Sequence, residues 1–316
     1  MRLFLLACAL CPLFLLSPTT VEARRERVEI AMVLWRGETA AEQGFREAMA
    51  ASPDFEVVIT TFDADQNKER LQQILAGLDP KRFRLAYTFG TMVTQAALQT
   101  PGDLPIIFNI VQRPVEAGVV KSLAHPDGRA TGASNLVPME SAFRTLSTIM
   151  NIRKLGFVYS SHDPAPRYQL ADIQQQQKQF GFQVKEFPIQ GKQGIAATMK
   201  QVIDARVDAV IFPSDSFVKA NGSEIIGILN RHRIPTVVII PEMVKENGAL
   251  VSLGPDYRTL GRLAARNALQ VLHGKHPGEL PVATVPHLSL SVNLRTADRL
   301  GIHFPLQLLS VSTVVK

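Results

Sequence analysis

Polar side chains follow an apolar segment near the middle of the second half of this sequence. In the stretch VIFPSDSF an apolar run ends at Phe212, and Pro-Ser-Asp-Ser follows, with Asp215 and Ser216 at its end. In an open α/β sheet, ligands bind in the loops just beyond the carboxyl ends of the strands. A helix that starts in such a loop presents free N–H groups, which suit carboxylates. Asp215 could therefore cap a helix, contact a ligand amine or hydroxyl, or do both.

Loops after other apolar runs supply further candidate contacts. Trp35 and Phe89 could form apolar walls, since an aromatic residue at a strand end often lines a pocket. Thr91 could cap a helix or offer its hydroxyl to a ligand. The planar guanidinium of Arg113 suits a carboxylate if it faces the cleft. The other candidate contacts in these loops are Glu38, Gly90, Asn135, Asp163, Glu242 and Asp256.

Motifs of the common catalytic and metal sites are missing from the sequence. There is no GxSxG, HExxH or GxxxxGK[ST] motif, and the closest histidines, His273 and His276, lie in an expected turn. Both cysteines, Cys8 and Cys11, lie in the apolar N-terminal segment. Once this segment is removed, as expected below, the chain contains no cysteine. This excludes disulfides, thiolate metal sites and cysteine catalysis. We therefore predict binding without turnover, and no cofactor or metal.

The N-terminal segment has the features of a secretory signal peptide. Arg2 gives a positive start, residues 3–16 are almost wholly apolar, and small residues precede a cleavage point after Ala23. We expect residues 1–23 to be removed and the protein to be exported to the periplasm. A retained N-terminal membrane anchor is the alternative.

The length and composition are typical of a soluble protein with two domains. The chain has 316 residues, of which 46% are hydrophobic and 20% charged, and domains usually contain about 100–200 residues. The net charge of +6 is scattered along the chain. Without a basic patch interleaved with aromatic residues, nucleic-acid binding is not expected.

Apolar β-branched runs alternate with helical patterns along most of the chain. The expected strands form two sets of four, beginning near Val28, Phe55, Leu85 and Pro105, and near Lys154, Phe182, Asp208 and Ile234. Corresponding strands of the two sets lie at a nearly constant spacing along the sequence. The pattern predicts two α/β lobes, each a doubly wound parallel sheet with crossover helices.

The chain is expected to pass between the two lobes several times. The expected lobes are 24–133, completed by about 255–280, and 134–254, completed by about 281–316. The expected crossings lie near residues 131–137, 248–254 and 288–294. Single-residue alternation in HLSLSVNL predicts a half-exposed or edge strand. Lobes joined by several strands form a hinge, and a hinge allows a cleft to close.

Four segments resemble bacterial ABC-transporter substrate-binding proteins. They are PIIFNIVQRPVEAGVVKSLAHPDGRATGASNLVP, PSDSFV, VKENGALVSLGPDYRTLGRLAARNALQVLHGKHPGELPV and SVNLRTADRLGIHFP. The corresponding family patterns include P-I-V-F-x-x-V-x-D-P-V-x-A-G-L-V, P-T-D-N-x-V, and G-x-D-Y-x-x-L-G-x-x-A-A. Some members of this family take up tryptophan and other aromatic amino acids.

The resemblance implies a type I periplasmic-binding fold that closes on a small molecule. It implies that Thr91 contacts a ligand carboxylate, that Asp215 contacts an ammonium group, and that Asp256 lies near the hinge. Arg113 stands where the family has an acid, and HDPAPR replaces the family's E-P-N-S loop. These departures make an acidic or aromatic-acid ligand an alternative to an amino acid.

The function expected from these observations is solute capture for an ABC importer. The ligand would be an amino acid, an aromatic compound or another carboxylate-bearing compound, bound by a monomer. The partners would be a membrane permease and its ATPase. The alternative is a sensing role, in which the loaded protein docks on a sensor kinase or chemoreceptor.

Overall fold

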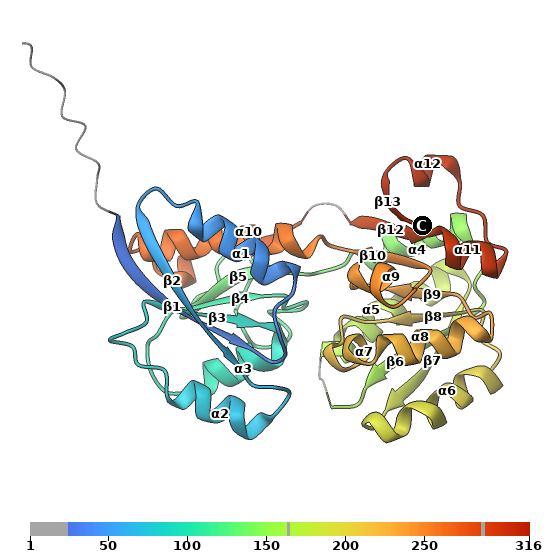
Figure 1. The fold of residues 1–316 in the computed structure, drawn as a ribbon, viewed down its shortest axis with the longest axis horizontal. Helices are drawn as coiled ribbons and strands as arrows, with labels where there is room; N and C mark the ends of the chain where they lie inside the picture. The colour runs from blue at the N-terminus through green and yellow to red at the C-terminus, as the bar shows by residue number, and fades with distance from the viewer. Residues whose placement is uncertain (1–24, 163–164, 286–287) are drawn as a thin grey trace, which may run out of the picture.

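The protein consists of two α/β lobes that lie side by side (Figure 1). The computed structural model describes residues 25–162, 165–285 and 288–316. The expected signal peptide and the candidate residue Asp163 lie outside the described residues. The expectation of two parallel-sheet lobes is confirmed, and each of the eight expected strands begins within two residues of its predicted position.

Lobe 1 is built on a parallel sheet whose strand order, over the described residues, is β11-β5-β4-β3-β1-β2. The strands are β1 (Glu26–Leu34), β2 (Phe55–Asp63), β3 (Leu85–Phe89), β4 (Ile106–Asn109), β5 (Ala130–Ser134) and β11 (Ala283–Thr284). The helices are α1 (Ala40–Ala50), α2 (Lys68–Ala76), α3 (Gly90–Gln99) and α10 (Tyr257–Leu272). Helices α1 and α10 cover one face of the sheet, and α2 and α3 cover the other (Figure 1). Because both faces are covered, the central strands are apolar along their length.

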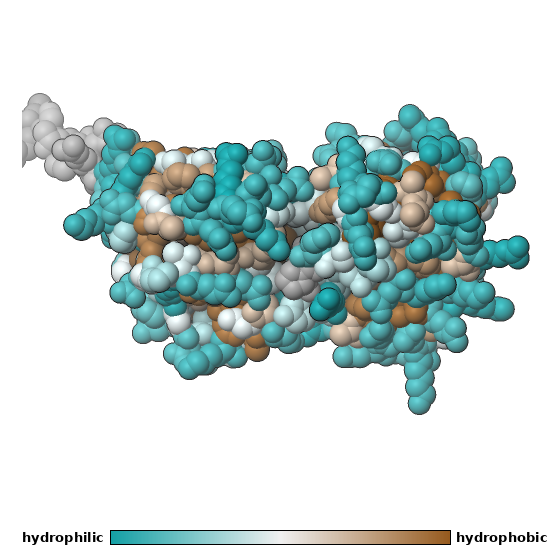
Figure 2. Space-filling model, turned by 90° about the horizontal axis from the view of Figure 1, so that it is seen from below, coloured by the Kyte–Doolittle hydropathy of each residue, from teal (hydrophilic) through white to brown (hydrophobic). Residues whose placement is uncertain are grey.

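Lobe 2 is built on a larger sheet, with the order β13-β12-β10-β9-β8-β6-β7 among the described strands. The strands are β6 (Lys154–Ser160), β7 (Gln183–Ile189), β8 (Ala209–Phe212), β9 (Thr236–Val238), β10 (Val251–Gly254), β12 (Ser289–Asn293) and β13 (Ser312–Val315). The α-helices are α4 (Met139–Ile149), α5 (Ala165–Phe180), α6 (Ile195–Asp204), α7 (Ser216–Ala220), α8 (Gly222–Arg231), α9 (Glu242–Glu246), α11 (Leu294–Leu300) and α12 (Leu306–Leu309). Two short 3-10 helices cover Lys192–Gly194 in lobe 2 and Pro277–Glu279 beside lobe 1. Figure 2 shows that the surface of both lobes is mostly hydrophilic on the side seen from below.

The chain passes between the lobes after β5, after β10 and after β11. The second passage follows Gly254, because residues 251–254 form a strand of lobe 2 and not a connection. Strand β11 pairs with β5 and therefore belongs to lobe 1, so that lobe extends past the expected boundary at residue 281.

The prediction that HLSLSVNL forms an edge strand is wrong. Its central part, β12, lies between β10, to which it is antiparallel, and β13, to which it is parallel. The sequence analysis did not expect β13, and this added strand takes the edge position. The alternation in β12 therefore reflects small polar residues inside a sheet: Ser291 is buried.

A buried carboxylate supports the packing of lobe 1. Thr39 caps α1, and its backbone N–H and hydroxyl both donate to Glu42 Oε2 at 2.7 Å. Tyr87 Oη donates to Glu42 Oε1 at 2.5 Å, and Asn109 Nδ2 donates to Tyr87 Oη at 3.1 Å. Burial raises the pKa of Glu42, although these hydrogen bonds oppose the rise.

Replacing Glu42 with glutamine should change how stability depends on pH. A raised folded-state pKa gives a stabilising contribution that is complete below the ordinary pKa of glutamate and is lost as pH rises through the folded pKa. Glutamine does not titrate, so the stability of the natural protein relative to the Glu42→Gln variant should fall as pH rises from about 4 to 7. Urea unfolding across this range measures the difference, and a difference that grows with pH would contradict the assignment.

Glu47 on the same helix provides a control of opposite sign. Its hydrogen bond and charge interactions with Arg262 and Arg258 lower its pKa. The contribution of Glu47 should therefore be present above the ordinary glutamate pKa and lost as pH falls. The stability of the natural protein relative to Glu47→Gln should therefore fall as pH drops below about 4, and should stay nearly constant over the window in which the Glu42 difference falls.

Candidate functional site

Two adjoining cavities lie where lobe 1 faces lobe 2. The outer cavity has a volume of about 440 Å³ and the inner cavity about 30 Å³. Asp215 and Ser216 line both. Both cavities are bounded by loops at the carboxyl ends of strands, the position at which open α/β sheets bind ligands.

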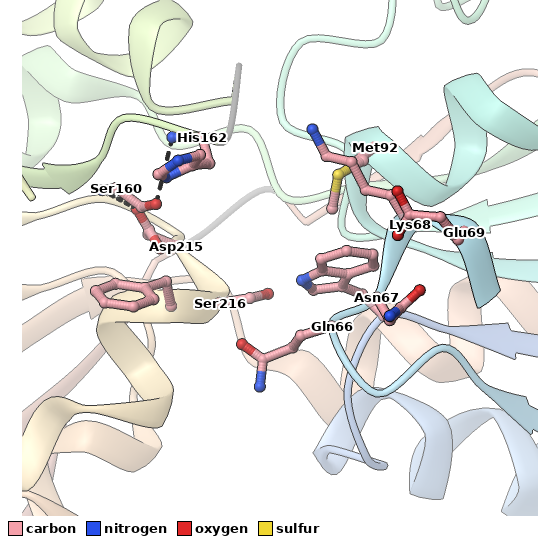
Figure 3. A pocket seen from close by; sticks show the side chains of 11 residues that line it. Gln66, Asn67, Lys68, Glu69, Met92, Ser160, His162, Asp215 and Ser216 are labelled. Carbon is pink, nitrogen blue, oxygen red and sulfur yellow. Dashed lines mark hydrogen bonds between the residues drawn. The ribbon is translucent and has the colours of Figure 1, made fainter. Parts of the chain in front are cut away.

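The outer cavity is formed by opposing side chains from the two lobes. Figure 3 shows Gln66, Asn67, Lys68, Glu69 and Met92 of lobe 1 on one side, and Ser160, His162, Asp215 and Ser216 of lobe 2 on the other. Trp35 and Phe217 complete the lining. Trp35, Met92 and Phe217 supply apolar surface, and the polar residues lie mainly at the exposed start of α2.

The inner cavity receives residues from both lobes and from the segments that pass between them. Its lining consists of Arg36, Phe89, Gly90, Thr91, Ile110, Gln112, Asn135, Ser214, Asp215, Ser216, Ile240 and Tyr257. The volume of about 30 Å³ leaves room for a group of only a few atoms. A ligand that occupies both cavities would place a small polar group inside and its larger part outside.

Helix α3 begins at the inner cavity. Gly90 has a φ of 81°, a conformation that glycine adopts without steric cost. The N-cap position is Phe89, and no described side chain accepts a hydrogen bond from the first turn. Thr91 is therefore not the cap of this helix. Backbone N–H groups of the first turn carry partial positive charge and suit a carboxylate.

Asp215 both caps a helix and lines the cavities. Its Oδ1 accepts from Val218 N at 3.0 Å at the start of α7, and its Oδ2 accepts from Ser160 N at 2.6 Å at the end of β6. The side chain is buried, and burial raises its pKa, opposed by these backbone hydrogen bonds. Asp215 is thus a helix cap, and its contact with a ligand stays a prediction that its place in both cavities allows.

A hydrogen-bonded chain joins the two inter-lobe segments to lobe 2. Asn135, just after β5, donates from Nδ2 to Ser214 Oγ at 3.2 Å. Ser214 Oγ lies 2.8 Å from Tyr257 Oη, at the start of α10. Burial raises the pKa of Tyr257 well above its ordinary value, so this phenol stays protonated. The wall of the inner cavity is therefore built partly from the hinge itself.

Three inner-cavity side chains hold a buried polar atom that has no partner among the described residues. The atoms are Arg36 Nε, Gln112 Nε2 and Asn135 Oδ1. Gln112 and Asn135 are almost fully buried, with exposed fractions of 3% and 1%. Leaving such groups unpaired costs free energy, so a polar group bound in the cavity would be stabilised by them.

Seven of the candidate residues lie at these cavities. They are Trp35, Phe89, Gly90, Thr91, Asn135, Asp215 and Ser216. The sequence analysis missed Arg36, Gln112, Ser214 and Tyr257. Each of these four is adjacent in the chain to a residue that was selected: Trp35, Arg113, Asp215 and Asp256. Most of the loops were identifiable from the sequence, but the direction of each side chain was not, and the loop at residues 66–69 of the outer cavity was missed.

Arg113 does not line either of these cavities, contrary to expectation. Its Nε donates to Asp172 Oδ2 at 3.1 Å, a second guanidinium nitrogen also contacts Asp172, and Nη1 pairs with Glu116 at 2.8 Å. Asp172 lies on α5 of lobe 2, so Arg113 forms an ion pair across the two lobes. Its donors are engaged, which argues against the predicted contact with a ligand carboxylate.

Three acidic candidates also lie outside the lining of these two cavities. Glu38 pairs with Arg46 on the surface of lobe 1, at 2.6 Å. Asp256 caps α10 by accepting from Thr259 N at 2.6 Å. Glu242 begins α9, where burial raises its pKa and its Oε2 has no described partner. The sequence indicated acids in the right loops, and helix capping or ion pairing accounts for Asp256 and Glu38.

Candidate metal sites and membrane-spanning helices are absent from the described residues. The described residues contain no cluster of three or more His, Cys, Asp or Glu side chains that could hold a metal ion. None of the described helices combines the length and apolar composition needed to cross a membrane.

Comparison with known proteins identifies the family of the chain. The family described as ABC transporter substrate binding protein matches residues 30–316. A "Tyrosine-binding protein" of Clostridioides difficile (strain R20291) is 26% identical over 260 residues, covering 82% of this chain and 73% of that protein.

Solved structures show the same fold. The ABC domain from Streptococcus pneumonia in complex with L-Trp aligns with a TM-score of 0.85 at 22% identity, over 92% of this chain and 100% of that chain. A conserved domain protein from Vibrio cholerae aligns at 0.84 with 24% identity, over 92% and 99%. The match to the family covers nearly the whole described chain and agrees with the motifs in the sequence. This chain belongs to the ABC transporter substrate-binding proteins, a family of solute-binding proteins that are not enzymes.

Proposed function

We propose that this protein is the exported, periplasmic substrate-binding component of an ABC importer and captures an amino acid between its two lobes. The observation that carries the proposal is the separation of hydrogen-bond donors and acceptors around the inner cavity. Lobe 1 contributes the first turn of α3 and the unpartnered amide nitrogen of Gln112. Asn135 Oδ1, in the segment after β5, and the carboxylate of Asp215, in lobe 2, offer acceptors.

This arrangement matches the main-chain groups of an amino acid. The carboxylate would accept hydrogen bonds from α3 and Gln112, and the ammonium group would donate to Asn135 and Asp215. Charge-assisted hydrogen bonds of this kind are stronger than neutral ones. A ligand that spans the cleft in this way contacts both lobes at once, so its binding favours the closed arrangement.

The side chain of the ligand would occupy the outer cavity. Trp35, Met92 and Phe217 offer apolar surface there, and the volume of about 440 Å³ accommodates a large side chain. Aromatic side chains pack well against such walls. The tyrosine-binding relative and the structural neighbour that holds L-Trp support an aromatic amino acid as the first class to test.

The proposed role in transport is inferred from the family and not from the cavity alone. Substrate-binding proteins of this family work with ABC permeases, and the closed, loaded protein would present its two lobes to such a permease and its ATPase. Export by the N-terminal segment and action as a monomer are parts of the same proposal. Loss of uptake of the bound compound in cells that lack this protein would support import; unchanged uptake would favour a sensing role.

Thermal unfolding of the mature protein against a panel of amino acids, aromatic acids, dicarboxylates and purines tests the ligand class. A ligand at 100 times its dissociation constant stabilises the folded state by about 2.7 kcal/mol, which raises the unfolding temperature by several degrees. We expect the largest shift with an aromatic amino acid. A Glu38→Ala variant, altered outside both cavities, should show the same shift. The absence of any shift across the panel would contradict the proposed ligand class.

A further inference from the structure

We propose that Arg36 selects ligands that carry a carboxylate, by binding that group in the inner cavity; this inference rests on the proposed function and extends it. Arg36 follows β1 in lobe 1, directly after Trp35. It lines the inner cavity, whereas Trp35 lines the outer one. The two adjacent side chains thus contact different parts of the cleft.

The guanidinium of Arg36 is held beside the start of α3. Its Cζ lies 5.7 Å from the centroid of the Phe89 ring. Phe89 is the N-cap residue of α3, and Gly90 and Thr91, which follow it, line the same cavity. An aromatic face attracts a guanidinium at this distance through the ring quadrupole. The positive side chain and the helix N-terminus therefore border one small cavity.

The donors of Arg36 are not used by the protein, as far as the described residues show. Its Nε is buried without a hydrogen-bond partner, and no described carboxylate lies within 4.0 Å of the guanidinium. Arg113 and Arg46 differ in this respect, because each pairs with an acid. Arg36 is thus a cation at the cavity whose partner has to come from elsewhere.

The acids that face Arg36 do not take that role. Both oxygens of Asp215 accept backbone N–H groups, from Val218 and Ser160. Glu242 is the other nearby acid; burial raises the pKa of both carboxyls, and the positive charge of Arg36 acts in the opposite direction. Arg36 interacts with these acids through space, without a direct ion pair.

A carboxylate fits the vacant donors better than the other groups of a small solute. Guanidinium and carboxylate form short, charge-assisted hydrogen bonds, and the planar fork of arginine adds geometric selectivity. The neighbouring N–H groups of α3 favour the same negative charge. An ammonium group in this position would meet two positive partners. The inner cavity should therefore accept an acid that lacks an amine more readily than an amine that lacks an acid.

Calorimetric titration with three probes of matched shape tests this inference. The probes are L-tyrosine, 3-(4-hydroxyphenyl)propionate, which lacks the amine, and tyramine, which lacks the carboxylate. The variants are Arg36→Met, which removes the charge but keeps an extended side chain, and Arg36→Lys, which keeps the charge but loses the fork. Arg46→Met is the control, because it removes an arginine of lobe 1 that lies outside both cavities.

The expected result is a change of selectivity. Arg36→Met should weaken binding of the two acids by about 10- to 100-fold, the range for loss of a hydrogen bond between charged groups. It should leave tyramine unchanged or bound more tightly, and Arg36→Lys should fall between the two. Arg46→Met should change no dissociation constant by more than about twofold.

Two outcomes would overturn the inference in distinguishable ways. Suppose that the unaltered protein binds L-tyrosine and that Arg36→Met weakens the binding of all three probes equally, or of none. Arg36 then does not bind the carboxylate, and the proposed function stands. If the unaltered protein binds none of the three probes, the inference falls together with the proposed aromatic amino-acid ligand. Unfolding temperatures measured without ligand separate a folding defect in Arg36→Met from a binding defect.

Discussion

Replacing Asp215 with alanine should abolish measurable binding of an amino acid and lower the free energy of unfolding by about 1–2 kcal/mol. The loss of stability follows from the two backbone hydrogen bonds, at 3.0 Å from Val218 N and 2.6 Å from Ser160 N, that the carboxylate accepts. The loss of binding follows because the ammonium group would have no acidic partner among the residues that line the inner cavity. Calorimetric titration and urea unfolding measure the two effects separately.

Asp256 provides a matched control for this variant. It is also the N-cap of a helix, with an accepted hydrogen bond of 2.6 Å from Thr259 N, but it lines neither cavity. Asp256→Ala should lose a similar amount of stability and keep its affinity for the ligand. Equal loss of affinity in both variants would mean that Asp215 acts through the fold rather than through contact with the ligand.

The pH dependence of binding gives a second check on Asp215. Burial raises its pKa, so the carboxylate becomes protonated at a higher pH than an exposed aspartate does. A neutral carboxyl attracts an ammonium group more weakly than a carboxylate. Affinity should therefore decline, as pH falls, before an ordinary aspartate pKa is reached, and Asp256→Ala, which keeps Asp215, should show the same decline.

Replacing Gly261 with alanine should destabilise the protein by about 3 kcal/mol, at the upper end of the usual range for overpacking. Gly261 lies on α10 where this helix contacts α1. A Cβ at this position would be 1.9 Å from Ala41 O and 2.7 Å from Phe45 N, both backbone atoms. Gly44 on α1 is equally restricted, with a Cβ position 2.1 Å from Arg258 O. The two helices approach closely because neither has a side chain at the contact.

Gly227 shows what the same substitution should do where space is available. It lies inside α8, and the nearest atom to its Cβ position is a flexible Arg231 nitrogen at 3.7 Å. Glycine inside a helix costs up to about 1 kcal/mol relative to alanine, so Gly227→Ala should stabilise the protein slightly. Urea unfolding of both variants tests the sign as well as the size. Similar effects at the two positions would show that the α1–α10 contact does not require glycine.

The Gly261 prediction also bears on how the lobes are built. Helix α10 follows the strands of lobe 2 in the chain, yet it packs in lobe 1 beside α1. Residues 255–280 were expected to complete lobe 1, and α10 packs there. The helix itself was predictable from its apolar periodicity, which spans Tyr257–Leu272.

Within the site, prediction from the sequence reached the loops but not the side chains. Arg113 and Gln112 are neighbours, and only Gln112 lines the inner cavity, while Arg113 turns to Asp172. Consecutive residues in extended backbone point in opposite directions, so choosing one of a pair requires the backbone path. Asp172 lies on a helix of the other lobe, and a contact between residues so distant in sequence leaves no local pattern.

Sequence patterns alone predicted the two-lobed α/β fold, the family and most of the loops that border the cleft. These properties follow from local patterns: apolar runs form buried strands, periodic segments form helices, and strand ends in parallel sheets meet at one edge. The tertiary structure decided which charges remain available at the cavity. In the folded protein Arg113 forms an ion pair and Asp256 caps α10. Arg36 Nε has no partner among the described residues. The reason is physical: whether a charged group is free depends on every polar atom within a few ångströms of it, and those atoms come from distant parts of the chain.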